Sequence, residues 1–240
     1  ATNMPPHNLG EICDAVVAMI DNPDIEIHEL LQIVPGPDFP TGGVIYGRGG
    51  IVEAYRGGKG RVVVRARCTI EETTKGGEQI VITEIPYMVN KAMLLEKTGD
   101  LVRQKTIEGI SFIRDESDRS GLRVVIGIKK DNYGEVVLNK LYKYTSLQNT
   151  FAINSLALVK LQPKLMGLKE LISHYIEHRH EVTVRRTEHD LRKARERLHI
   201  LEGYRIALDH IDEVVETIKS SSSPGEALQR LRERFEFSEI

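Results

Sequence analysis

Basic side chains are concentrated in one stretch of a chain that is otherwise nearly neutral. The 240 residues carry a formal net charge of -2, yet positions 1–46 contain no lysine or arginine. From Arg48 to Arg67 the chain holds six basic residues and the single acid Glu53. Such a stripe is typical of a surface that neutralises nucleic-acid phosphates. The predicted contact residues are Arg48, Lys59, Arg61, Arg65 and Arg67.

The segment from Arg61 to Glu71 alternates between two kinds of side chain, which predicts one half-buried strand. Residues on one face of a strand lie about 6.6 Å apart, so the outward residues could follow a phosphate backbone. An ordinary solvated sheet face is the alternative, and the residues alone leave both open. The inward set would be Val62, Val64, Ala66 and Cys68, and the outward set Arg61, Val63, Arg65 and Arg67.

Arg48 and Lys59 belong to a stretch, 42–60, that is rich in glycine, and we expect both to lie in loops. Small residues let a backbone approach a phosphate, although such loops are usually simple turns. The string GGKGR at 57–61 resembles a nucleotide-binding loop only superficially. It lacks the four-residue spacer and the Ser or Thr that a P-loop requires, so we predict no nucleotide site.

Other reactive side chains favour structural roles. Asp115, Glu116 and Asp118 have the carboxylates that magnesium prefers, but with Gly121 they form a predicted hairpin turn, which is the better explanation. His178 and His180 are two residues apart on a predicted helix and do not share a face, so we predict no metal site. The two cysteines, Cys13 and Cys68, fit a reducing compartment. No apolar run is long enough to cross a bilayer, and we predict a cytoplasmic location.

Hydrophobic periodicity predicts an α+β fold, in which two hairpins separated by a helix form an antiparallel sheet. The first helix would begin after the cap Asn8, with Glu11 in its first turn, and continue through Asp21. The later expected elements are a helix at 25–34, strands at 61–71 and 79–85 joined by a turn at 73–78, a helix at 89–105, strands at 110–114 and 122–129, and a helix at 134–147.

A single long helix is predicted from Leu168 to about Ile218, roughly 75 Å at 1.5 Å per residue. Such a helix must extend beyond its globular domain, and its apolar spacing of three and four is typical of a coiled coil that needs a partner helix. Ser223 and Glu226 would cap a further helix that ends near Phe235. The apolar seam consists of Ala194, Leu198, Leu201, Tyr204, Leu208, Ile211, Val215 and Ile218.

Six segments in order, which together cover most of the chain, resemble the A subunits of bacterial type II DNA topoisomerases. They are ATNMPPHNLGE, PGPDFPTGG, GRGGIVEAYRGGKGRVVVRAR, EIPYMVNKAMLLEK, EGISFIRDESDRSGLRVVI, and QPKLMGLKELI followed by RRTEHDLRKARERLHILEG. VNKA after IPY and the IRDESD turn are more similar to the DNA gyrase branch of that family than to the topoisomerase IV branch.

The resemblance implies an internal segment of the DNA breakage-reunion core, in three parts. Residues 1–33 would be the helical connection from the winged-helix region, 34–163 an antiparallel-sheet tower domain, and 164–240 the coiled-coil arm and the start of the gate region. The family's nucleophilic tyrosine would precede Ala1. Tyr55 is followed by Arg56, the reverse of the family's Arg-Tyr pair, so we expect a packing role and assign no catalytic residue.

The same resemblance implies that the full enzyme alters DNA supercoiling by ATP-dependent double-strand passage. Its implied partners are double-stranded DNA, the gyrase B subunit and a second copy of the A subunit, in an A2B2 heterotetramer. ATP and magnesium would be bound by the B subunit, so we expect no cofactor on this chain and no membrane partner. The alternatives are the A subunit of topoisomerase IV and a non-enzymatic DNA-binding coiled-coil scaffold.

Overall fold

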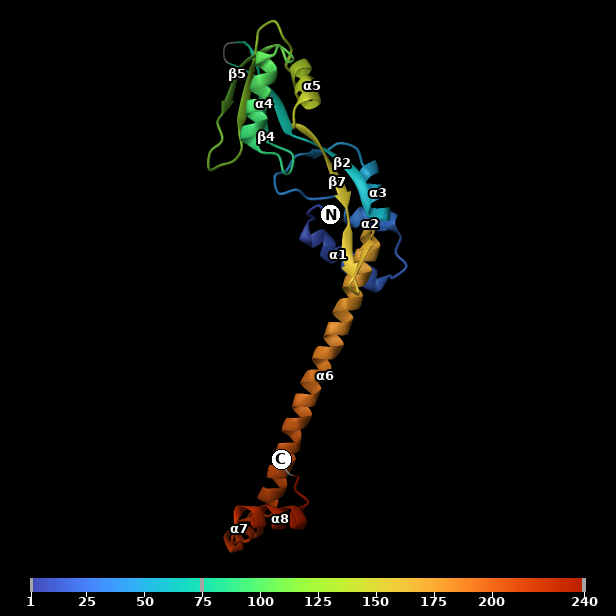
Figure 1. The fold of residues 1–240 in the computed structure, drawn as a ribbon, viewed down its shortest axis with the longest axis vertical. Coiled ribbons are helices and arrows are strands. Elements are labelled where there is room, and N and C mark those ends of the chain that lie inside the picture. The colour runs from blue at the N-terminus through green and yellow to red at the C-terminus, as the bar shows by residue number, and fades with distance from the viewer. Residues whose placement is uncertain (1, 74–75, 239–240) are drawn as a thin grey trace. The chain divides into compact units, whose positions relative to one another are not determined.

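The computed structural model describes residues 2–73 and 76–238 (Figure 1). Every strand pair in this part of the chain is antiparallel, which confirms the predicted α+β class. The helices are α1 Leu9–Asp21, α2 Ile27–Ile33, α3 Gly49–Gly57, α4 Lys91–Arg103, α5 Gly134–Tyr144, α6 Leu168–Asp209, α7 Ile211–Ser220 and α8 Pro224–Phe235. The strands are β1 Val44–Ile45, β2 Lys59–Arg65, β3 Arg67–Glu72, β4 Glu78–Glu84, β5 Ile110–Asp115, β6 Val124–Ile128, β7 Gln148–Asn154, β8 Leu156–Val159 and β9 Gln162–Leu165.

The first two helices begin at side-chain caps. The Asn8 carboxamide oxygen accepts hydrogen bonds from the backbone N–H groups of Gly10 and Glu11, at 2.9 and 3.3 Å, which confirms the predicted start of α1. Helix α2 begins with a capping box in which Glu26 and Glu29 satisfy each other's backbone N–H groups. Both helices therefore start where the sequence places a polar acceptor.

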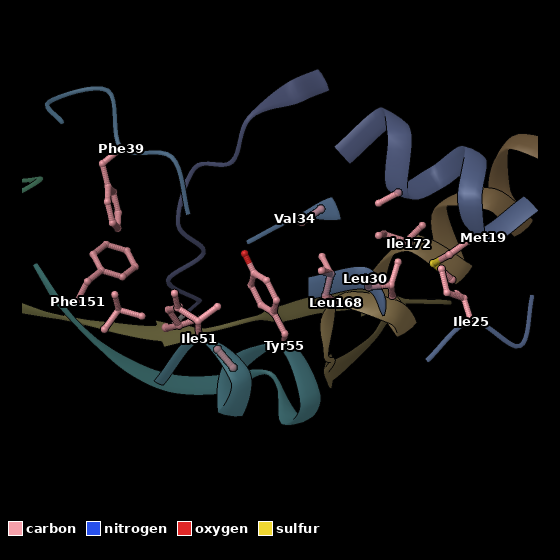
Figure 2. Packing of buried hydrophobic residues seen from close by; sticks show 14 of the residues in the cluster. Met19, Ile25, Leu30, Val34, Phe39, Ile51, Tyr55, Phe151, Leu168 and Ile172 are labelled. Atoms are coloured by element: carbon pink, nitrogen blue, oxygen red, sulfur yellow. The ribbon is translucent and has the colours of Figure 1, made fainter. Parts of the chain in front are cut away.

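A first sheet, ordered β1-β2-β7, lies over the core that α1, α2 and α3 complete. Val62 and Val64 are inward residues of β2 and are almost fully buried. Figure 2 shows Leu30 of α2 beside Leu168 and Ile172 of the first turns of α6, with Phe39 and Phe151 packed together further along the same core. The two aromatic ring centroids are 5.4 Å apart. This core holds β2 in place and turns its other face outward.

A second sheet, ordered β3-β4-β6-β5, forms a separate core with α4 and α5 (Figure 1). Ile80, Ile82 and Ile126 from its central strands are almost completely buried, and Leu94 and Leu141 from the two helices pack into the same cluster. The whole of this part, from β3 to α5, is inserted between β2 and β7, which pair with each other in the first sheet.

The structure differs from the sequence prediction in four places. The strand predicted at 61–71 is divided between two sheets, because the chain leaves β2 after Arg65 and enters β3 at Arg67. The glycine-rich stretch 42–60 contains the helix α3 instead of loops alone, and Lys59 begins a strand. Strands β7, β8 and β9 occupy 148–165, where no strand was predicted. The long helix ends at Asp209, and α7 begins after a break at His210. The predicted turn at 73–78 includes residues 74–75, which lie outside the described residues.

The chain divides into two compact units, residues 1–176 and 177–240. In the second unit, the Ser223 hydroxyl accepts a hydrogen bond from the Glu226 N–H at 3.3 Å, and Pro224 occupies the first turn of α8, which confirms the predicted cap. The apolar seam residues predicted on α6 and α7 are all exposed. Their partner helix and the three-part division at 33/34 and 163/164 stay predictions.

Among the helices that the structure describes, none is both long and apolar enough to span a membrane.

Candidate nucleic-acid interface

The outward face of β2 and β7 combines positive charge with small polar side chains. Directly opposite residues of an antiparallel pair point to the same side of the sheet. The pairing of Arg61 with Ala152 therefore determines which residues of β2 and β7 share this face. Its eight residues include no carboxylate, so nothing on this face repels a polyanion. They are Lys59, Arg61, Val63 and Arg65 of β2, and Gln148, Thr150, Ala152 and Asn154 of β7.

Lys59 and Arg61 are the most available cations of this face. Both are exposed, and within residues 2–73 and 76–238 neither makes an ion pair of 4.0 Å or less with a carboxylate. They are opposite Asn154 and Ala152 on β7, which leave the two long side chains uncrowded. An unpaired cation on a strand face can bind a phosphate without first giving up another partner.

Arg65 lies on the same face but is held by neighbouring side chains. Its guanidinium carbon is 3.8 Å from the centre of the Tyr46 ring and 4.9 Å from that of Tyr142. Its Nε donates a hydrogen bond of 2.6 Å to Oε1 of Gln148. The side chain is half-buried, so Arg65 differs from Arg61 although both follow the same strand pattern.

Arg67 is on β3 and therefore belongs to the second sheet. Its Nε is 3.1 Å from Oε1 of Glu84, the residue opposite it on β4. The Arg67 side chain is 58% exposed, so the pair is a surface ion pair that leaves much of the guanidinium accessible. Arg67 is thus not on the face that Lys59 and Arg61 share.

Arg48 is the N-cap residue of α3 and belongs to neither strand of the β2–β7 face. Helix α3 packs on the inward face of β2, because Ile51, Ala54 and Tyr55 share a core with Val62 and Val64. Arg48 lines a surface hollow together with Asn8, Glu11, Asp38 and other residues of 35–51. Of the five residues predicted from sequence, Lys59 and Arg61 are exposed on one face. Arg65 and Arg67 have partners within the chain, and Arg48 is at the N-terminal end of α3.

The glycines of 49–60 allow close packing of α3 on β2. A side chain at Gly60 would place its Cβ 2.9 Å from that of Ala54, and one at Gly50 would place its Cβ 2.6 Å from the Arg61 carbonyl carbon. Gly58 ends α3 in the left-handed conformation with φ of 75°. The GGKGR string is consequently a helix end and a strand start, and it does not have the geometry of a phosphate loop.

Tyr55 is a core residue, as predicted. It is almost fully buried, and its hydroxyl is 2.8 Å from Nε2 of His7. Burial raises the pKa of the Tyr55 phenol well above its usual value, and the nearby Glu11 charge adds to the increase. Burial also lowers the pKa of His7. A phenol so placed is neither exposed nor readily ionised.

The carboxylates at the end of β5 and in the turn that follows interact with nearby residues of the same chain. The Asp115 carboxylate is 2.6 Å from the Lys91 ammonium, and this hydrogen bond, with others from Ser117, lowers the pKa of Asp115 to about 2. Glu116 is 3.3 Å from Arg123. The hydroxyl and N–H of Ser120 both donate to Asp118. The hairpin-turn interpretation accounts for all three carboxylates.

The β7 half of this face, with Gln148, Thr150 and Asn154, was not predicted from the sequence. A usable signal was present, because the residues 150–154 alternate between polar or small and buried apolar side chains. Asn3 extends the polar edge, since its carboxamide donates to the Ala152 carbonyl at 2.6 Å and its backbone pairs with Asn154. These residues supply hydrogen-bonding groups beside the two available cations.

Comparison with known proteins gives one consistent family. A family model that describes the A subunit of DNA gyrase and topoisomerase IV matches residues 1–240. A Pseudomonas aeruginosa protein, named as the A subunit of DNA gyrase, is 58% identical over 96% of this chain and 25% of its own length. Proteins of the same name from Clostridium acetobutylicum and Halalkalibacterium halodurans are 54% and 55% identical, over 100% and 99% of this chain and 29% and 28% of their own lengths. The chain therefore spans little more than a quarter of the length of these relatives.

Proposed function

We propose, from the premise that the chain belongs to the family of DNA gyrase and topoisomerase IV A subunits, that it holds and positions duplex DNA within a type II topoisomerase. The full protein would alter DNA supercoiling by ATP-dependent passage of one duplex through a double-strand break in another. The relatives named as gyrase A subunits favour gyrase over topoisomerase IV. Residues 34–163 would be the tower domain, 1–33 its connection to the winged-helix region, and 164–240 the arm that leads to the gate.

The observation that supports DNA binding is the outward face of β2 and β7. It presents Lys59 and Arg61, which make no ion pair with the residues that the structure describes, beside hydrogen-bonding side chains and without a carboxylate among its eight residues. Contacts of this kind neutralise phosphates and carry no base information, so they suit a duplex of any sequence. We give Lys59 and Arg61 the largest share of the direct contact. Arg48 and Arg67 complete the proposed DNA-contacting set, whereas Arg65, which was predicted with them, is held by its partners within the chain.

The proposed assembly places the remaining chemistry on other chains. The gyrase B subunit would bind ATP and magnesium, and a second copy of the A subunit would complete an A2B2 heterotetramer. The geometry of residues 57–61 agrees with this division, because the glycines there end α3 and begin β2. The chain's own residues would then bind and orient the duplex, and none is assigned to the cleavage step.

Removing Lys59 and Arg61 together tests the proposal. The double variant Lys59→Ala/Arg61→Ala should bind unrelated duplex sequences equally weakly, and the slope of log affinity against log salt should fall by about 2. Each cation that neutralises a phosphate contributes about one unit to that slope. Fluorescence anisotropy at several salt concentrations measures both quantities.

The matched control is Lys97→Ala/Lys130→Ala, which removes the same charge from exposed positions in the second sheet's part of the chain. It should leave the salt slope near that of the unchanged protein. The β2 face would be an ordinary solvated surface if both double variants lost DNA affinity and salt slope equally, or if the Lys59/Arg61 variant lost neither.

The 240-residue chain should neither cleave nor relax supercoiled plasmid when mixed with the gyrase B subunit, magnesium and ATP. The expectation follows because no residue of the chain matches the family's nucleophilic tyrosine, and Tyr55, which precedes Arg56, is buried with its hydroxyl against His7. Gel electrophoresis after protease treatment measures both activities, and the complete protein from a relative is the positive control. A DNA product linked to a tyrosine of this chain would contradict the proposal.

A further inference from the structure

The second sheet's part of the chain is joined to the first sheet by a narrow neck. The chain enters this part through Ala66, directly after β2, and returns through Leu147, directly before β7. At the neck the Ala66 N–H donates to the Leu147 carbonyl at 2.8 Å. Figure 1 shows β2 and β7 running together into this region. The backbone connects the two parts through two segments, which is few for a part of this size. Such narrow connections act as hinges unless side chains restrain them.

Arg65 is the first side chain that restrains the neck. Tyr46 and Gln148, two of its three partners, belong to the first sheet and the segment that follows β1, whereas Tyr142 belongs to α5 of the second core. The Tyr142 hydroxyl also donates to the Ala66 carbonyl at 3.2 Å. The planar guanidinium, placed between two aromatic rings, therefore connects the two bodies through a cation–π arrangement that a flexible ammonium reproduces poorly.

Glu84 is the second side chain that restrains the neck. It ends β4 in the second sheet, and its Oε2 accepts a hydrogen bond of 2.5 Å from the N–H of Gly43, which precedes β1. Its Oε1 pairs with Arg67. Gly42 and Gly43 have φ of 69° and 96°, and a Cβ on Gly42 would lie 2.5 Å from the Glu84 Cδ. Because glycine has no side chain, the Glu84 carboxylate can approach the backbone at these two positions.

We propose that Arg65 and Glu84 form a latch across the neck that fixes the second sheet's part relative to the DNA-contacting face. In this role Arg65 is a positioning residue and supplies little of the direct phosphate contact. The identity of the positioned ligand rests on the proposed function, whereas the restraint itself does not. Tyr87, which follows β4, also packs on Phe39 and Phe151 of the first core. We therefore expect loss of either latch residue to loosen the neck locally without separating the two bodies.

Amide hydrogen exchange in the 240-residue chain, resolved by NMR, tests the latch. Arg65→Lys keeps the charge but loses the planar stack and the Nε donor, and should speed exchange of the Ala66 amide at least about tenfold. Glu84→Ala should have a similar effect there and expose the Gly43 amide. Exchange at Ile126, inside the second core, should stay within about twofold in both variants. These results should appear without any change in the salt slope of DNA binding.

Arg61→Lys is the matched control, since it makes the same replacement on the same face outside the latch. It should leave Ala66 exchange unchanged. The proposal would be overturned if the Ala66 amide stayed protected from exchange in both latch variants. It would also be overturned if Arg65→Ala lowered the salt slope by about 1 with exchange unaltered, a result that would make Arg65 a phosphate ligand. Failure of the Lys59/Arg61 experiment with a positive exchange result would instead remove DNA as the ligand while leaving the latch in place.

Discussion

Gly50→Ala is expected to destabilise the first unit by about 3 kcal/mol or more, or to prevent it from folding. The new methyl carbon would lie far inside van der Waals contact of the Arg61 carbonyl oxygen and 2.6 Å from the Arg61 carbonyl carbon. Neither backbone can move away cheaply, because β2 is paired with both β1 and β7. Urea unfolding followed by circular dichroism measures the loss as a lower midpoint.

The adjacent residue supplies the control for this prediction. Gly49 occupies the same helix turn, and a Cβ there would meet nothing within 4 Å. Gly49→Ala should be neutral or stabilise the protein by up to about 1 kcal/mol, because alanine loses less conformational entropy than glycine on folding. A similar midpoint for Gly50→Ala and Gly49→Ala would show that α3 does not pack on β2 as closely as described.

Leu30→Ala is expected to lower the free energy of unfolding of the first unit by about 2–5 kcal/mol. Leu30 is fully buried in the core that joins α1, α2, β2 and the first turns of α6 (Figure 2). The truncation removes apolar contact area and leaves a cavity that helices anchored at both ends cannot easily close. Hydrogen exchange of amides in α2 and β2, together with urea unfolding, reports the change for this unit separately from residues 177–240.

Leu9→Ala is the corresponding surface control. Leu9 is also a helical leucine but is 77% exposed, so its truncation should change stability by no more than about 0.5 kcal/mol. Equal effects at Leu9 and Leu30 would mean that burial of Leu30 in this core does not stabilise the fold. Together with the glycine pair, this comparison separates cavity formation from steric overlap.

The neck adjoins the outward face of β2 and β7, for which we propose DNA contact. Lys59 and Arg61 are exposed on β2, whereas Arg65, further along the same strand, is packed between aromatic rings. The cations of β2 therefore have two different environments along one strand. Under the proposed function, exposed cations would contact the duplex while Arg65 and Glu84 would keep the inserted part at a constant angle to it.

Local signals in the sequence predicted most of the helices, the sheet class and the orientation of β2. Caps such as Asn8 and Ser223 depend on residues within one helical turn, and their predicted hydrogen bonds are present. The alternation that places Val62 and Val64 inward is likewise a property of neighbouring residues. The family resemblance also came from the residues alone, and the match over positions 1–240 confirms it at the level of the family.

Only the tertiary structure decided where strands change partners and which cations are available. The alternation continues unbroken across Ala66, so periodicity cannot reveal that β2 and β3 belong to different sheets. The helix α3 is hidden by glycines whose purpose appears only when β2 lies against them. Arg61 and Arg65 look alike in the sequence. They differ because Arg65 meets Tyr142, 77 positions later in the chain, and a side chain's freedom depends on neighbours that only folding brings close.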